Sequence, residues 1–236
     1  MTEDAATMSL IEHLEELRRR LIISVAAIVV GAVIGFFLSE PVLALLRQPL
    51  PDAHRTLIVT SLTDAFAVRL KISGFLGIAL AMPVILYQLW RFVTPGLTRS
   101  ERRLVWPLMI VALALFALGV FVGYVIIPYA ITFLLSFAME GVEPFLTLPE
   151  YVGFVTTMML IFGLVMEFPI LLIALARVGI IDHRRLARSR RWTILGIVIF
   201  AIVATPGGDP ISPLILSSVM YLLFEGSLLV IRLMRR

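Results

Sequence analysis

The chain has 236 residues, of which 60% are apolar and 15% are charged, and its mean hydropathy is +1.03. This composition excludes an ordinary soluble domain and a disordered chain. The absence of cysteine excludes disulfides, thiol nucleophiles and thiolate metal sites. The net charge of +4 comes almost entirely from arginine. We interpret it as a sign of membrane orientation rather than of nucleic-acid binding, because such an apolar chain offers no soluble basic face.

The segment before the first apolar run is acidic and amphipathic. A cleaved signal would begin with a basic stretch, so we expect the first apolar run to remain in the protein as a membrane helix. We expect residues 9–20 to form an amphipathic helix beside the membrane. Ser9 and Glu12 fit a capping box at its start.

Six apolar runs follow, and each is compatible with a helix that crosses a membrane. They cover residues 21–38, 72–90, 104–127, 152–178, 192–205 and 214–231. Because a crossing needs about 20 apolar residues, we predict one all-α transmembrane domain over 1–236 with six spans. The fifth run has 14 residues and Glu225 interrupts the sixth. We therefore expect both of these helices to be short and to thin the bilayer or lean on neighbours.

The basic residues fall on one side of this arrangement. Sixteen of the 20 Lys and Arg residues lie before the first span, between spans two and three, between spans four and five, and after the sixth. The positive-inside rule then places both termini in the cytoplasm. The two long connections on the other side, residues 39–71 and 128–151, are rich in Pro but also carry Leu, Phe and Val. We expect them to form an outer cap of short amphipathic helices.

The sequence gives little support for an enzyme. The three histidines lie far apart and outside the spans, and the chain has neither an HExxH motif nor a GxSxG motif. The aspartates also lie outside the spans, which disfavours a paired-Asp intramembrane protease. No metal site and no cofactor are indicated.

Two acidic features call for an explanation. Glu16 lies on the first amphipathic helix with arginines three and four residues away, so it is either self-paired within that helix or part of an acidic patch for an external cation. Glu167 lies inside the fourth apolar run, two residues before Pro169. It either hydrates a proline kink, or stays protonated or bonded to a neighbouring helix, or serves as a docking point for a partner helix or as part of a hydrated path within the membrane. We expect Glu225, nearer a helix end, to be structural and to approach the interface or Arg232.

Four motifs occur in a fixed order along the chain. They are HLEELRRRL (13–21), PVILYQLWRFVTPGL followed by SERR (83–103), MEFP (166–169) and ATPGGDPIS (204–212). Together with six spans they resemble the TatC family, the polytopic core of the twin-arginine protein translocase. The resemblance covers nearly the whole chain. The TPGGD segment is one residue longer than the family's TPxD pattern, and Pro213 stands where Gln is more usual, so the role of Asp209 is the least supported.

The resemblance implies a role for individual residues. It places signal-peptide binding at Glu16 and Glu101, with Phe92 and Arg18 nearby. From the residues alone, Glu101 is also a capping residue and Phe92 a member of an aromatic belt. The resemblance places the docking of single-span TatA-like and TatB-like subunits at Glu167 and the last two spans, and gives Pro49 and Asp209 structural roles in the outer loops. It implies a multimeric complex in the cell membrane that exports folded proteins with the energy of the proton gradient.

Two other functions remain open from the sequence. The protein could be a small secondary transporter or channel that uses Glu167 as its ion or proton site, although its two halves are unalike. It could also be a structural membrane anchor, which would leave Glu167 and the acidic helix unexplained.

Overall fold

A computed structural model of the chain describes residues 10–50, 56–93, 105–137, 145–177, 181 and 183–234. Within these ranges the protein is all-α, apart from one isolated β-bridge. Five helical segments in the described part are long and apolar enough to cross a membrane. They are Ile11–Phe37, Asp64–Val93, Val105–Leu135, Leu148–Arg177 and Ile211–Leu233. The predicted fold class is therefore confirmed: the chain is a multi-pass helical membrane protein.

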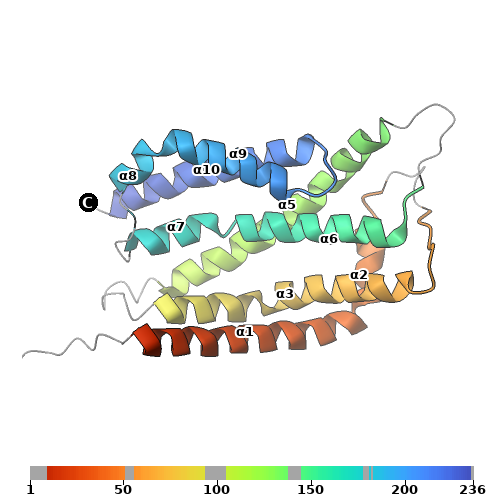
Figure 1. Ribbon diagram of the computed structural model, residues 1–236, viewed down its shortest axis with the longest axis horizontal. Helices are drawn as coiled ribbons and strands as arrows, with labels where there is room; N and C mark the ends of the chain where they lie inside the picture. Colours follow the sequence, from red (N-terminus) through yellow and green to blue (C-terminus); the bar gives the residue numbers. More distant parts are fainter. Residues whose placement is uncertain are drawn as a thin grey trace, which may run out of the picture.

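Most helices run along the long axis of the molecule (Figure 1). These are α1 (Leu10–Phe37), α3 (Asp64–Val93), α6 (Leu148–Val165), α7 (Phe168–Arg177), α9 (Arg190–Ala204) and α10 (Ile211–Met234), whereas α5 (Val105–Leu135) crosses them obliquely. The short helices α2 (Ser39–Leu46) and α8 (His183–Arg188) lie at opposite ends, which we call the α2 end and the α8 end. Helix α1 begins and α10 ends at the α8 end, so both ends of the described chain lie at the same end of the long axis.

The first helix is continuous, which corrects the predicted division between an amphipathic helix and a first span. Helix α1 runs through 28 residues without a break at Arg20 or Leu21. Arginine and leucine are good helix formers, and no proline or glycine interrupts the chain before Gly31, so nothing ends the helix at the expected membrane boundary.

Helix α1 packs closely against α3 because glycines face each other. A Cβ atom added to Gly31 would lie 2.8 Å from the carbonyl oxygen of Gly77, and one added to Gly77 would lie 2.8 Å from the carbonyl oxygen of Ile28. Small residues allow helix backbones to approach closely in a membrane, where packing drives association. This contact fixes α1 beside α3 and thereby sets the geometry of the α8 end.

Helices α3 and α5 extend further toward the α2 end than the apolar runs predicted. Helix α3 begins at Asp64 rather than at Ile72, because the Asp64 carboxylate accepts hydrogen bonds from the backbone N–H groups of Thr60 and Ser61, both at 2.9 Å. This is a capping arrangement that the apolar pattern alone does not reveal. Helix α5 continues to Leu135 with Pro128 inside it.

The two predicted outer loops meet at the α2 end. Ile58 pairs with Thr147 in an isolated parallel bridge, with hydrogen bonds from the Ile58 N–H to Leu146 and from the Leu148 N–H to Ile58. Helix α2 is a short helix of the predicted cap, and the Tyr151 hydroxyl donates to the Leu46 carbonyl at its end. Beyond α5, the described part of the second loop is a turn and an extended segment rather than a further helix.

The fourth span is broken where the sequence places a proline. Helix α6 ends at Val165, Met166 and Glu167 form a turn, and α7 begins at Phe168. Pro169 has no N–H to donate to the carbonyl of Val165, so the helical ladder is interrupted at this point. The break turns Glu167 out of a regular helix.

The last two helices differ in length. Helix α9 has 15 residues, about 22 Å of helix, and agrees with the prediction of a short fifth span. The prediction of a short sixth helix is wrong, because α10 has 24 residues and is about 36 Å long. Glu225 does not break it, since glutamate is a good helix former and its side chain has an ionic partner on α9.

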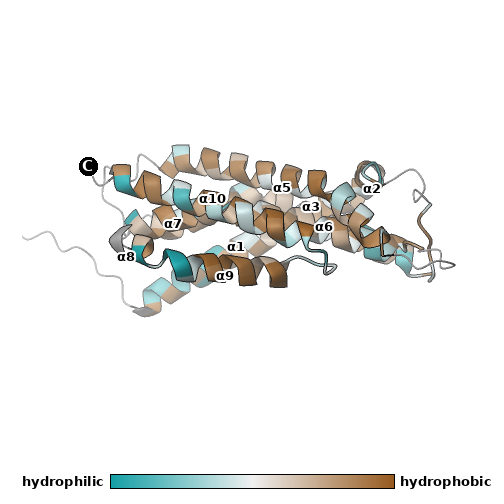
Figure 2. Cartoon of the chain, turned by 90° about the horizontal axis from the view of Figure 1, so that it is seen from above, coloured by the Kyte–Doolittle hydropathy of each residue, from teal (hydrophilic) through white to brown (hydrophobic). Residues whose placement is uncertain are grey.

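Buried side chains form three apolar clusters along the bundle. One lies at the α2 end around Leu46 and Ile72, a second joins α6, α9 and α10 around Phe162 and Phe224, and a third joins α3, α5 and α7 around Trp90. Outside these clusters, many large apolar side chains are exposed on the helices. Figure 2 shows that apolar residues make up most of the length of these helices. This apolar exterior suits a lipid environment.

Candidate functional site

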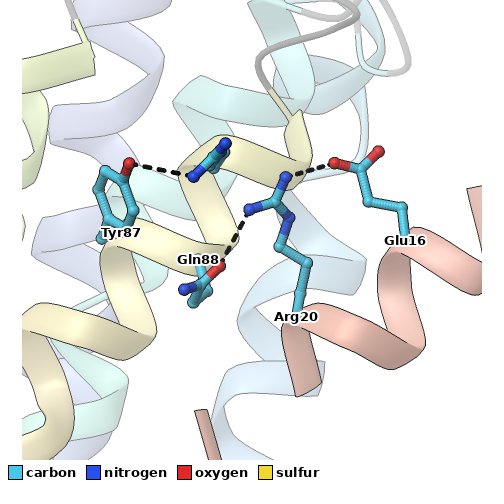
Figure 3. Close-up of polar contacts among 5 residues, drawn as sticks. Glu16, Arg20, Tyr87 and Gln88 are labelled. Carbon is cyan, nitrogen blue, oxygen red and sulfur yellow. Dashed lines mark hydrogen bonds and ion pairs between the residues drawn. The ribbon is translucent and has the colours of Figure 1, made fainter. Parts of the chain in front are cut away.

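Glu16 and Arg20 form an ion pair on the first helix, at the α8 end (Figure 3). One guanidinium nitrogen of Arg20, Nη2, lies 2.5 Å from Oε1 of Glu16. Four residues separate the two positions, so their side chains share one face of α1. Both side chains are largely buried, with exposed fractions of 16% for Glu16 and 15% for Arg20. The self-paired interpretation of Glu16 is therefore correct for this structure.

A second helix holds the same guanidinium. Nη1 of Arg20 donates to Oε1 of Gln88 on α3 at 3.0 Å, and Gln88 is buried. Gln88 and Arg20 are 68 positions apart in the sequence. Glu16, Arg20 and Gln88 thus form a polar chain between α1 and α3, and Oε2 of Glu16 is buried without a hydrogen-bond partner among the described residues.

An aromatic pair lies on the same two helices. The rings of His13 on α1 and Phe92 on α3 stack with their centroids 4.4 Å apart and their planes at 22°. His13 precedes Glu16 by three positions, so the two residues share a side of the helix. The predicted site residue Phe92 is thereby placed beside the Glu16 region, in a half-buried position.

The other two predicted signal-binding residues differ in what the structure shows of them. Arg18 is exposed, and it follows Glu16 by two positions, which puts it on a different side of α1. Glu101 lies outside the described residues. The distance between the carboxyl groups of Glu16 and Glu101 therefore stays a prediction.

A cavity of about 980 Å³ opens between α3, α7 and α9. Most of its lining is apolar, and it includes His13 and Phe92 at one end as well as Glu167. Among the described residues that line it, Glu167 is the one carboxylate. The cavity therefore joins the aromatic pair at the α8 end to the acidic residue within the fourth span.

Glu167 has an unusual environment for a carboxylic acid. Both of its carboxyl oxygens are buried, and neither has a hydrogen-bond partner among the described residues. Its backbone still bonds locally, because its N–H donates to Leu164 and its carbonyl accepts from Leu171. A buried acid without a partner costs free energy, so it is a candidate for binding a polar group that this chain does not supply.

Two further acidic residues, Glu225 in α10 and Asp209 just before it, have local partners within the described chain. Glu225 accepts a hydrogen bond from Nη2 of Arg190 at 2.8 Å, rather than approaching Arg232 as the sequence suggested. Asp209 is 2% exposed, and its Oδ1 accepts from the backbone N–H of Ser212 at 2.7 Å. Asp209 thus caps the first turn of α10, with Pro210 in the next position, where proline is favoured.

The two glycines of the TPGGD motif form the turn before Asp209. Gly207 and Gly208 have φ angles of 97° and 70°, a left-handed conformation that favours glycine. Pro49 lies in the turn after α2, half-buried beside the fully packed Leu50. Pro49 and Asp209 thus both lie in or beside turns of this fold, and the roles that the resemblance gives them stay predictions.

Two residues of the site were missed by the sequence analysis, whereas the spacing of Arg20 from Glu16 was noted there as the basis of a pair within the helix. Gln88 and His13 gave no such signal, because their roles depend on the α1–α3 contact. Among the described residues, no group of three or more His, Cys, Asp and Glu side chains could hold a metal ion.

Comparisons with known proteins agree with this arrangement. The family model described as Sec-independent protein translocase protein (TatC) matches residues 12–218. The chain is 38% identical over 229 residues to a Sec-independent protein translocase protein TatC of Carboxydothermus hydrogenoformans. The match covers 97% of this chain and 94% of that protein. It is 34% identical over 232 residues to the TatC protein of a Synechocystis species, with 98% and 91% covered.

A solved structure shows the same fold. The crystal structure of the twin arginine translocase receptor TatC in the detergent DDM superposes with a TM-score of 0.81 at 34% sequence identity, and the match covers 93% of this chain and 99% of that one. With the family model matching most of its length, the chain belongs to the Sec-independent protein translocase (TatC) family.

Proposed function

We propose that this protein is the receptor subunit of a twin-arginine export system, and that it binds signal peptides carrying an arginine pair at the α8 end. The single observation that carries the proposal is the largely buried Glu16 carboxylate, which already binds a guanidinium group, that of Arg20. A pocket that accepts an internal guanidinium has the charge and the shape to accept an external one. Membership of a translocase family supports the same function.

The proposed site combines charge with an aromatic wall. Glu16 and Glu101 would each receive one guanidinium of the signal peptide through charge-assisted hydrogen bonds. Phe92, stacked on His13, would offer a flat apolar surface to the side chains of the peptide. Arg18, exposed on α1, would stay at the rim, where it can meet acidic groups that flank the arginine pair.

Glu167 is proposed as a docking point for the single-span TatA-like and TatB-like subunits. Its carboxyl oxygens are buried and lack partners within the described chain, so a polar side chain from another helix would satisfy them. Helix α9 supplies the neighbouring apolar surface, with Val203 at 80% exposure. Glu167 together with α9 and α10 would thus recruit partner helices into a multimeric complex.

The topology proposed for this complex follows the charge pattern of the sequence. The α8 end, where α1 begins and α10 ends, would face the cytoplasm in the cell membrane, and the α2 end would face outward. The protein itself would carry out no covalent chemistry. The proton gradient would supply the energy for export of folded proteins.

Peptide binding tests the receptor function directly. The purified full chain in lipid nanodiscs would be titrated with a fluorescent synthetic signal peptide that contains an arginine pair. We expect the double variant Glu16→Gln with Glu101→Gln to lose binding while it keeps its thermal stability. Glu15→Gln is a suitable control, because it removes one acidic charge from an exposed position of the same helix that does not share the face of Glu16 and Arg20. Unchanged affinity in the double variant would remove the assigned site.

The alternative of a small-solute transporter is less consistent with the cavity. Apart from Glu167, the polar side chains that the described residues contribute to its lining are His13, Trp90 and Thr193, and these do not form a polar path for an ion or a hydrophilic solute. Liposomes that contain this protein alone separate the two functions. Solute flux in the absence of partner subunits would favour transport and contradict the receptor proposal.

A further inference from the structure

Glu16 is closed to a new cation in this structure. Its Oε1 is occupied by Arg20, its Oε2 is buried without a partner among the described residues, and the side chain as a whole is 16% exposed (Figure 3). A bidentate bond to an incoming guanidinium needs both oxygens. A signal peptide can therefore use Glu16 fully only if Glu16 leaves Arg20.

Gln88 gives Arg20 a position that does not depend on Glu16. The amide oxygen of Gln88 accepts from Nη1 of Arg20 at 3.0 Å, while the bond to Glu16 uses Nη2. If Glu16 turned toward another cation, the Gln88 bond would still satisfy one side of the guanidinium. This arrangement lowers the cost of releasing Glu16, because an entirely unpaired buried guanidinium would be far less favourable.

We propose that Arg20 is an internal competitor, a guanidinium that the arginine of a signal peptide must displace from Glu16. This inference rests on the proposed function, because it takes Glu16 as a receptor for signal-peptide arginine. The exchange replaces one guanidinium by another on the same carboxylate, so most of the interaction energy cancels. Because Arg20 competes for Glu16, it weakens the binding of every cationic peptide by the same factor. It thereby sets the minimum intrinsic affinity for Glu16 that a signal peptide needs in order to bind.

Competition by Arg20 would favour peptides with an arginine pair by setting a minimum affinity that a peptide needs for export. A lysine lacks the planar fork of arginine and binds a carboxylate less well in a bidentate geometry. With the internal competitor present, a lysine-containing peptide would fall below the occupancy needed for export at a concentration where an arginine pair still binds. Without it, both peptides would bind more tightly, and the ratio of their affinities would stay the same.

The variant Arg20→Gln tests this inference in nanodiscs with two synthetic peptides, one with an arginine pair and one with a lysine pair. We expect both dissociation constants to fall by at least roughly fivefold, because that factor is the upper range for an exposed ion pair and this pair is largely buried. Arg19→Gln removes the same charge one position away on the exposed side of α1, so it measures the general electrostatic effect. Arg20→Lys keeps the charge without the fork, and we expect an intermediate gain.

A double-variant cycle identifies the route of the effect. In the Glu16→Gln background, Arg20→Gln should no longer change the affinity, because no carboxylate remains to be shared. Weaker binding by Arg20→Gln, or a gain no larger than that of Arg19→Gln, would overturn the inference. The proposed function fails separately: Glu16→Gln alone would then leave binding of the arginine peptide unchanged.

Discussion

Arg190 and Glu225 join the short helix α9 to the long helix α10 through a hydrogen-bonded ion pair of 2.8 Å. Arg190 begins α9, and Glu225 lies in the part of α10 that approaches the α8 end. At its other end, α9 is connected to α10 by the turn that contains Gly207 and Gly208. Helix α9 is therefore fixed at both of its ends, although it buries few of its own side chains.

Breaking the ion pair between Arg190 and Glu225 should destabilise the contact between α9 and α10 slightly. Because the two side chains are 52% and 31% exposed, we expect Glu225→Gln to lower the free energy of unfolding by less than about 1 kcal/mol. The loss should shrink as salt is added, since exposed ion pairs are screened. Thermal unfolding in detergent at two salt concentrations measures this. Arg191→Gln is the control, and an equal loss in both variants would argue against the pair.

Replacing Glu167 should separate stability from function. We expect Glu167→Leu to raise the thermal stability of the isolated protein, because it removes two buried oxygens without partners, each worth on the order of 1–3 kcal/mol. The same variant should lose co-purification with TatA-like and TatB-like subunits. Thr193→Val, a change in the lining of the same cavity, should keep the partners. A strongly destabilised Glu167→Leu protein would mean that the acid has a structural role.

The contact between α5 and α6 depends on glycine. A Cβ added to Gly119 would lie 2.4 Å from the carbonyl oxygen of Phe162, a backbone atom that cannot move aside cheaply. We therefore expect Gly119→Ala to destabilise the protein by about 3 kcal/mol. Gly226→Ala on α10 meets no atom within 4 Å and should be neutral or stabilising. Chemical unfolding of both variants in the same detergent compares them.

Asp209 should act through its hydrogen bond rather than through its charge. Because its Oδ1 caps α10 by accepting from the Ser212 N–H, we expect Asp209→Ala to cost about 1 kcal/mol. Asp209→Asn keeps the acceptor and should retain most of the stability. Thermal unfolding, combined with an export assay in cells, checks both variants. Full stability with no export in the Asn variant would show that the carboxylate is required for its charge.

The helices could be predicted because long apolar runs have few alternatives in a membrane, but their ends could not. The start of α3 depends on the Asp64 cap. It could not be predicted from the apolar pattern, because polar residues such as Lys71 interrupt that pattern. Glu225 seemed to interrupt the last helix, although a glutamate with an arginine on a neighbouring helix is compatible with it. The break at Glu167 was foreseeable, because a proline without an N–H acts locally.

The site was predictable only within one helix. The spacing of Glu16 and Arg20 indicates their ion pair, since a helix brings such positions together. The bond between Arg20 and Gln88 was not predictable, because it depends on the register of α1 against α3, which the glycine contact of Gly31 and Gly77 sets. The same register produces the stack of His13 on Phe92.

The pairing of Ile58 with Thr147 connects two loops that are far apart in the sequence. Its two backbone hydrogen bonds make the start of α6 depend on the segment that precedes α3. A peptide tag placed in either loop would therefore disturb both, and a protease cut in one would loosen the anchoring of the other. Because Tyr151 in α6 also donates to the Leu46 carbonyl of α2, both loops and α2 are connected to the start of the fourth span, which carries Glu167 further along.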